Sequence, residues 1–239
     1  MSWQFNSAQS LGAQTEQQDC LGAWPSEDGT SVLIVLADGA GGHHGGQQAA
    51  QAAAEMARSL WQRERPGIKQ AREFLEKTSR AAHDAVAAMP QSPRTTWLAL
   101  MAGESQAAWV HSGDSRLYHY TSGRLALRTQ DHSLMQMLVE NGRVGESDVH
   151  GHPNRGVLLQ SLGGPEYLPV GHGSAEVGGE DVFILCTDGV WSELDDTHFL
   201  NLARSSPQNR ARAAEEVIAK AVHTAGTKAD NASLWIVGR

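Results

Sequence analysis

Apolar positions along the chain follow two patterns, and each pattern predicts one type of element. Nearly continuous apolar runs that are too short for helices predict strands buried on both faces. Apolar residues spaced three or four apart predict amphipathic helices, and the second of these helices ends where Pro90 interrupts the pattern. The clearest predicted elements are strands at 32–37, 181–187 and 232–237 and helices at 49–60, 66–89 and 211–222.

Four further strand patterns lie close together between Thr95 and Thr129, in the runs TTWLALMA, QAAWVHS, RLYHY and RLALRT. Turn-forming pairs separate them, and such short connections predict an antiparallel meander. Ser133 is placed to cap a short helix that reaches about Glu140. Residues 141–164 are polar and glycine-rich and predict a loop. Because strands and helices come in blocks rather than in strict alternation, the fold class is expected to be α+β.

Composition narrows the classes of protein to consider. The chain has 239 residues, of which 40% are hydrophobic and 19% are charged, and it carries no linker-like segment, so a single domain over 1–239 is expected. A formal charge of -8 argues against a general nucleic-acid or anionic-membrane partner, and it fits either cation binding or solubility. The two cysteines lie far apart and indicate no disulfide framework. No signal peptide or membrane-length apolar run is evident, so a cytoplasmic location is expected.

Aspartates recur where apolar strands end. Asp38 and Asp188 each close an apolar run and are followed by glycine, and Asp230 stands just before the last strand pattern. If these strands are neighbours, the carboxylates meet and require cations, and oxygen ligands favour Mg²⁺ or Mn²⁺ over zinc. Asp114, in a turn, is a fourth acid of this kind. Each aspartate alone also fits an ordinary turn, and it is the repeated pattern that favours a metal site.

Eight short motifs follow one another along the chain. They are QQD at 17–19, DGAGGH at 38–43, TT at 95–96, SGDSR at 112–116, QDHSL at 130–134, LLQSLGG at 158–164, CTDGVW at 186–191 and DN at 230–231. This ordered set resembles the metal-dependent protein phosphatases of the 2C type, and most closely their single-domain bacterial members. The resemblance implies a four-layer αββα sandwich of two mostly antiparallel sheets flanked by helices, with a flap within 141–164.

The same resemblance implies an activity and its cofactors. The protein is expected to hydrolyse phosphoserine and phosphothreonine in proteins by attack of a water that bridges two Mn²⁺ or Mg²⁺ ions. Its partners would be phosphoproteins, including a serine/threonine kinase or its substrates. The implied roles are Asp38 as bridging ligand, the Gly39 carbonyl on one ion, Asp188 and Asp230 on the other, Asp19 on metal-bound water, Asp114 with Asp188 at a weaker third metal position, and His43 near the leaving group.

One departure from the family pattern leaves the level of activity open. By the same resemblance Gln14 is expected to contact the substrate, because it stands where relatives usually carry an arginine that grips the substrate phosphate. An amide lacks the charge and the fork of a guanidinium. A working phosphatase is favoured because every expected acid is present. A metal-binding pseudophosphatase and an adaptor domain, in which the aspartates only cap turns, are the alternatives.

Overall fold

The computed structural model describes residues 2–40, 45–145, 148–149 and 152–239. In these ranges the strands form two antiparallel five-stranded sheets. In spatial order, the first sheet contains β1 (Gln4–Ser10), β10 (Ala232–Gly238), β9 (Asp181–Cys186), β6 (Arg116–Thr121) and β7 (Arg124–Arg128). The second contains β2 (Asp19–Pro25), β3 (Val32–Asp38), β4 (Trp97–Ala102), β5 (Gln106–Ser112) and β8 (Gly171–Glu176).

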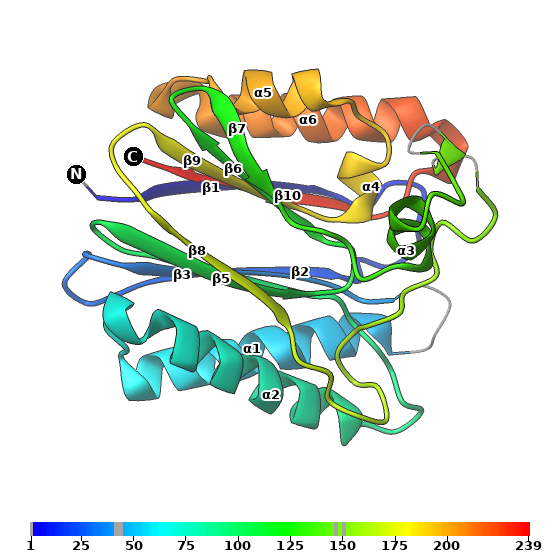
Figure 1. Ribbon diagram of the computed structural model, residues 1–239, viewed down its shortest axis with the longest axis horizontal. Coiled ribbons are helices and arrows are strands. Elements are labelled where there is room, and N and C mark those ends of the chain that lie inside the picture. Colours follow the sequence, from blue (N-terminus) through cyan, green and yellow to red (C-terminus); the bar gives the residue numbers. More distant parts are fainter. Residues whose placement is uncertain (1, 41–44, 146–147, 150–151) are drawn as a thin grey trace.

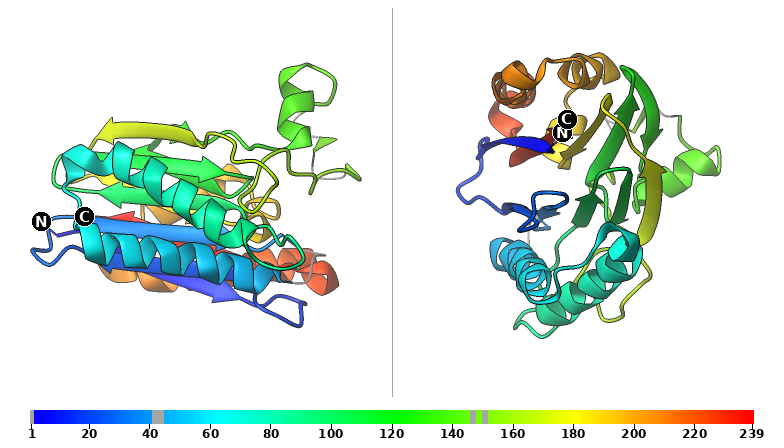
Figure 2. Two further views of the ribbon diagram at one scale, coloured as in Figure 1. Left: turned by 90° about the horizontal axis from the view of Figure 1, so that it is seen from below. Right: turned by 90° about the vertical axis from the view of Figure 1, so that its left-hand side faces the viewer.

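Helices cover the outer face of each sheet, which gives four layers (Figure 1; Figure 2). On the second sheet lie α1 (Gly46–Glu64) and α2 (Ala71–Ala87), preceded by the 3₁₀ turn η1 (Ile68–Gln70). On the first lie α5 (Asp196–Ala203) and α6 (Arg210–Ala225), with the 3₁₀ turns η3 (Pro207–Asn209) and η4 (Gly226–Lys228). The short helices α3 (Leu134–Glu140) and α4 (Asp188–Trp191) stand at one end of the sandwich. The predicted αββα arrangement is confirmed.

Strand β3 shows why an apolar run without alternation forms a strand here. Leu33 and Val35 pack toward α1 and α2, whereas Ile34 and Leu36 pack into the layer between the two sheets. Because successive side chains point to opposite faces, a strand buried on both sides must be apolar at every position. All four side chains are fully buried. The strand that ends at Asp38 is therefore a rigid support for that residue.

The predicted meander between Thr95 and Thr129 is wrong at its middle step. Strands β4 and β5 pair in the second sheet, and β6 and β7 pair in the first, so the chain crosses between the sheets after Ser112. A strand pattern identifies a strand but not its neighbour, since both sheets share one apolar interior. The crossing turn requires Gly113, whose φ is +104° and whose Cβ position would lie 2.8 Å from Thr96 Cγ2. This turn carries Asp114 to the end of the sandwich.

One other local prediction is confirmed and one is changed by the structure. The Ser133 hydroxyl accepts a hydrogen bond from the backbone N–H of Gln136 (3.2 Å) and caps α3, as its position predicts. The helix predicted over 66–89 is divided, because the 3₁₀ turn η1 precedes α2. Among the described helices, none combines the length and the apolar character needed to cross a bilayer.

Candidate active site

Five aspartates converge at one end of the sandwich because of how the strands pair. Asp19 begins β2 and lies opposite Asp38, the last residue of β3, across an antiparallel pair. Asp188 follows β9 and Asp230 precedes β10, and these strands are antiparallel neighbours too. Asp114 arrives on the crossing turn. The charges of the other four all act on Asp38, so the structure brings together all the predicted acidic metal ligands, at the end of the sandwich remote from the chain termini (Figure 1).

The backbone of Asp38 is fixed by two threonines. Its N–H donates to Thr96 Oγ1 (2.9 Å), and its carbonyl accepts from the Thr96 N–H (2.8 Å) and from Thr95 Oγ1 (2.9 Å). The next residue, Gly39, donates its N–H to the Gln18 carbonyl (3.1 Å), and a Cβ there would lie 2.3 Å from the carbonyl oxygen of Gly46. Only glycine fits this contact, so the Asp-Gly pair has a structural reason as well as the expected functional one.

One carboxylate oxygen of Asp19 accepts hydrogen bonds, and the other has no hydrogen-bond partner among the described residues. Ser233 Oγ (2.6 Å) and Thr187 Oγ1 (3.1 Å) both donate to Oδ2. The other oxygen, Oδ1, is buried and has no hydrogen-bond partner among the described residues. A buried carboxylate oxygen without a donor is costly, so its environment fits a cation or a cation-bound water.

Burial and mutual repulsion raise the pKa values of acids in the cluster. Burial, reinforced by Asp19 and Asp188, raises the pKa of Asp38 well above its usual value. Burial also raises the pKa of Asp19 to about 7 and that of Asp188 to about 6, and it raises the pKa of Asp114. The Asp38 side chain opposes part of the rise in the pKa of Asp188. Without a divalent cation to compensate the charge, the carboxyl groups of the cluster therefore retain protons.

The donor set fits hard divalent cations. Every acid in the cluster offers oxygen, which suits Mg²⁺ and Mn²⁺ rather than zinc. Within the described ranges no three His, Cys, Asp or Glu side chains are arranged so that they could hold one metal ion together. Octahedral sites of these metals take several ligands from water, so pairs of carboxylates with one bridging residue are sufficient. The unpartnered Asp19 oxygen and the raised pKa values carry this assignment.

Asp230 lies at the exposed side of the cluster, where Gln14 contacts it. Gln14 Nε2 donates to Asp230 Oδ1 (3.1 Å), which also accepts from the backbone N–H of Asn231 (2.8 Å). Asn231 ties this corner together, because its Oδ1 accepts from the Gln18 N–H (2.7 Å) and its Nδ2 donates to the Leu11 carbonyl (3.0 Å). Gln14 thus orients a predicted metal ligand, and its predicted contact with substrate stays a prediction.

The side chain of Arg116 is held in place beside the acidic cluster. The Arg116 guanidinium makes two 2.8 Å hydrogen bonds to the Asp131 carboxylate and lies 3.4 Å over the Trp191 ring. Trp191 Nε1 donates to the Asp114 carbonyl (2.9 Å). These contacts connect the Arg116–Asp131 pair, through Trp191, to the turn that carries Asp114.

Replacement of Arg116 by lysine is expected to destabilise the protein although the charge is kept. A lysine cannot form the fork to Asp131 or the stacking contact with Trp191, so we expect a loss of about 2 kcal/mol and a melting temperature lower by about 4–8 °C. Arg212→Lys is the matched control, because Arg212 pairs with Glu216 on the exposed surface of α6 and such pairs contribute little. Equal melting temperatures for the two variants would contradict the structural role of Arg116.

Arg155 is a site residue that sequence reasoning missed. It lines a cavity of ≈ 210 Å³ together with Arg116, Asp131, Trp191 and Asp188. Its charge opposes the rise in the pKa of Asp188, and its Nη1 lies 4.0 Å from the Glu193 carboxylate. It belongs to the polar segment 141–164, in which sequence alone does not say which side chain turns toward the cluster.

The hydroxyl groups beside the acids were given no role from the sequence, although Thr95, Thr96 and Thr187 lie within the quoted motifs. Thr95 and Thr96 fix Asp38, and Thr187 and Ser233 fix Asp19, yet threonine and serine at strand ends read as ordinary strand residues. Their adjacency to each predicted acid or its partner strand was the available signal. The predicted catalytic residue His43 falls in 41–44, outside the described residues, and its role stays a prediction.

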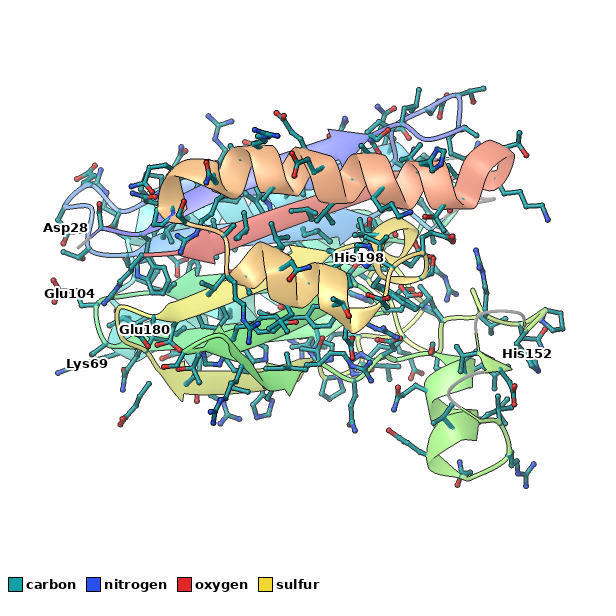
Figure 3. The ribbon with its side chains drawn as sticks, turned by 90° about the horizontal axis from the view of Figure 1, so that it is seen from above. Asp28, Lys69, Glu104, His152, Glu180 and His198 are labelled. Atoms are coloured by element: carbon teal, nitrogen blue, oxygen red, sulfur yellow. The ribbon has the colours of Figure 1, made fainter. Side chains whose placement is uncertain are left out.

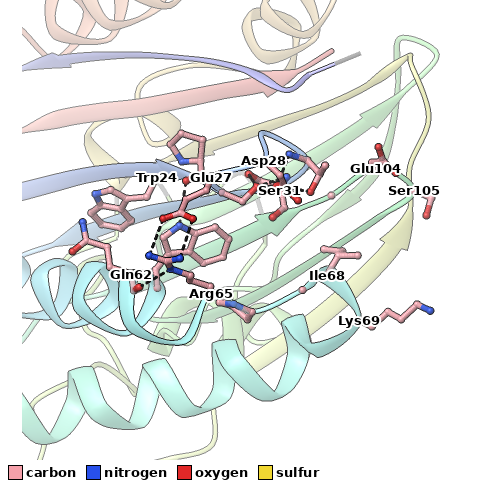
Figure 4. Close-up of a pocket in the computed structure, with 17 residues that line it drawn as sticks. Trp24, Glu27, Asp28, Ser31, Gln62, Arg65, Ile68, Lys69, Glu104 and Ser105 are labelled. Atoms are coloured by element: carbon pink, nitrogen blue, oxygen red, sulfur yellow. Dashed lines mark hydrogen bonds and ion pairs between the residues drawn. The ribbon is translucent and has the colours of Figure 1, made fainter.

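A larger cavity lies away from the cluster. It measures ≈ 940 Å³ and is lined by residues that include Glu27, Asp28, Arg65 and Glu104, where Arg65 and Glu27 form an exposed ion pair at 2.8 Å (Figure 4). Asp28 and Glu104 stand at one end of the sandwich and His152 at the other (Figure 3). None of the predicted site residues that the structure describes lines this cavity, whereas Asp188 lines the smaller one.

Comparison with known proteins decides the family. The protein phosphatase 2C family pattern matches residues 8–223. The chain belongs to this family. The predicted family and enzyme class are thereby confirmed, and the chain is a hydrolase of the protein phosphatase type.

Individual members of the family resemble the chain over most of its length. A serine/threonine phosphatase, stp, of Listeria monocytogenes is 28% identical over 231 residues, which cover 93% of this chain and 90% of that protein. The PstP phosphatase of Mycobacterium tuberculosis is 32% identical over 174 residues, 70% of this chain and 33% of that protein. A PstP catalytic domain solved with two manganese ions has a TM-score of 0.84 at 25% identity, covering 99% of this chain and 97% of that one.

Proposed function

We propose that this chain is an active metal-dependent phosphatase for phosphoserine and phosphothreonine in proteins. The observation that carries the proposal is the buried acidic cluster around Asp38, whose repulsion divalent cations would relieve. The relatives named serine/threonine phosphatase and the PstP domain with two manganese ions support the substrate class and the metal. The expected partners are phosphoproteins, including a serine/threonine kinase or its substrates.

In this proposal the carboxylates hold two Mn²⁺ or Mg²⁺ ions. Asp38 would be the common ligand of the ions, and the Gly39 carbonyl, Asp188 and Asp230 would complete the protein's donor set. Such ions, when bound, lower the pKa of water toward neutrality and neutralise charge on the phosphoryl oxygens. Asp114 and Asp188 belong to the weaker third position.

The protein's own contribution is to hold these oxygens in place before substrate arrives. Thr95 and Thr96 anchor the backbone of Asp38, and Ser233 and Thr187 orient Asp19. Anchored ligands need little rearrangement during the reaction, which is the main way in which an enzyme lowers a barrier of this type.

Arg155 is the residue we assign to the phosphate in place of the usual arginine at the Gln14 position. It shares the cavity at Asp188 and belongs to the predicted flap within 141–164. A guanidinium at this location can pair with phosphate oxygens through two hydrogen bonds. The 4.0 Å contact with Glu193 would hold the side chain near the cavity until substrate replaces it.

Arg155→Gln is expected to raise KM for a phosphothreonine peptide about 10-fold or more, with a smaller effect on kcat. Arg155→Lys should recover part of the loss, because it keeps the charge but not the fork. Arg124→Gln, an exposed arginine at the start of β7, is the matched control. Steady-state kinetics would contradict the assignment if Arg155→Gln and Arg124→Gln had the same KM.

Turnover of a phosphothreonine peptide in Mn²⁺ buffer tests the function itself. We expect phosphate release that stops when a chelator removes the metal and returns when Mn²⁺ is restored. Metal binding without phosphate release would identify a pseudophosphatase. Neither metal binding nor release would favour the adaptor alternative.

A further inference from the structure

A groove opens near the cavity at Asp188, between edge strands of the two sheets in the described part of the chain. Its volume is ≈ 860 Å³, and it is lined by Leu127 of β7 on one side and by 171–173 of β8 on the other. Strands β7 and β8 are the last strands of their sheets and lie on the same side of the sandwich (Figure 1; Figure 2). His111 and His132, whose rings stack at 4.6 Å, also line the groove.

Exposed apolar side chains are concentrated at this groove. Of the seven large apolar side chains that are exposed in the described part of the chain, four line it. They come from separate segments, so their gathering is a property of the fold and not of one apolar run. They are Leu127 (38% exposed), Met137 (40%), Leu159 (50%) and Leu168 (45%). A gathered apolar patch of this kind is typical of a binding surface.

The groove adjoins the cavity at Asp188. Arg128, Asp131, Ser133 and Gln136 line both. A polypeptide whose phosphorylated residue reaches Asp188 would therefore pass directly into the groove on this side.

We propose that this groove binds an apolar side chain of the phosphoprotein substrate, in the extended segment beside the phosphorylated residue. The proposal rests on the proposed function and adds a substrate preference to it. The open edges of β7 and β8 offer backbone groups to which an extended segment can add hydrogen bonds. Leu159 and Leu168 offer the apolar surface, and an apolar residue of the substrate that packs there leaves water.

Peptide kinetics can separate this groove from the catalytic centre. Phosphothreonine peptides that carry one leucine, moved stepwise along either side of the phosphothreonine, are compared with the matching alanine peptides. The doubly substituted protein with Leu159→Ser and Leu168→Ser is the groove variant. Leu125→Ser is its control, because Leu125 is similarly exposed (45%) on β7 but does not line the groove. Hydrolysis of p-nitrophenyl phosphate, which has no peptide, reports the chemistry alone.

We expect the parent and Leu125→Ser to prefer leucine at one position by about 10-fold in kcat/KM. The groove variant should lose that preference and hydrolyse p-nitrophenyl phosphate as the parent does. Hydrolysis of p-nitrophenyl phosphate without any leucine preference, or a preference that survives in the groove variant, would overturn the groove proposal alone. Absence of all hydrolysis by the parent would overturn the proposed function with it. A parent that sediments as a dimer and a groove variant that sediments as a monomer would assign the groove to a second copy instead.

Discussion

Asp38→Asn is expected to lower turnover of a phosphothreonine peptide by about 10³-fold or more, while the metal-free protein becomes no less stable. The neutral amide is a poor bridging ligand for two cations, so the charge that should oppose the phosphoryl oxygens is lost. The same change removes one of the mutually repelling acids, whose burial raises the pKa of Asp38 well above its usual value. The metal-free melting temperature should therefore stay the same or rise.

The opposite signs of these two effects distinguish a functional residue from a structural one. Asp84→Asn, an exposed aspartate on α2, is the matched control and should change neither quantity. If Asp38 only served as a turn residue, Asp38→Asn would lower the metal-free melting temperature. Peptide turnover would then fall only as far as the fraction of folded protein falls. Kinetics and thermal melting on the same samples decide between these outcomes.

Mn²⁺ is expected to raise the melting temperature by about 5–10 °C at about pH 7.5, when present at about 100 times its Kd, and by clearly less near pH 5.5. Burial raises the pKa of Asp19 to about 7 and that of Asp188 to about 6, from ordinary values of 3.8. The folded metal-free protein thus holds more protons at these groups than the unfolded chain, so they stabilise it at low pH. That stabilisation is lost as the pH rises through 6 to 7.

Metal and protons therefore compete for the same oxygens. Near pH 5.5 the cations must displace protons from these carboxyl groups. Near pH 7.5 few of these protons remain, and the cations relieve the repulsion between the carboxylates. Thermal melting with chelator and with Mn²⁺ at both pH values measures the difference. A shift that is equal at the two pH values, or that persists in Asp38→Asn, would place the metal elsewhere on the protein.

The strand-end aspartates could be predicted because the residues next to them in the sequence indicate their role. An apolar run that ends in Asp-Gly specifies both a buried support and a carboxylate at its end, and this holds at Asp38 and at Asp188. The helical spacing in α1 and α6 and the cap at Ser133 are local signals of the same kind. These features follow from residue spacing and do not depend on distant partners.

Features that depend on distant partners could not be predicted. Strand β8 contains no large apolar residue and forms because β5 offers it a pairing edge. The crossing after Ser112 depends on which sheet has room for β6. The position of Arg155 depends on the path of a loop, and the hydrogen bond from Gln14 to Asp230 joins residues 216 positions apart. Sequence identified these residues' chemical types but not their neighbours.

Anomalous X-ray diffraction from crystals soaked in Mn²⁺ would test most directly whether the acidic cluster exists to hold two cations. We expect two strong anomalous peaks that share the Asp38 carboxylate as a ligand, one beside the Gly39 carbonyl and the other beside Asp188 and Asp230. The same soak of Asp38→Asn crystals should show at least one peak lost. Absence of any peak at the cluster in the parent, with Mn²⁺ bound elsewhere or not at all, would contradict the assignment.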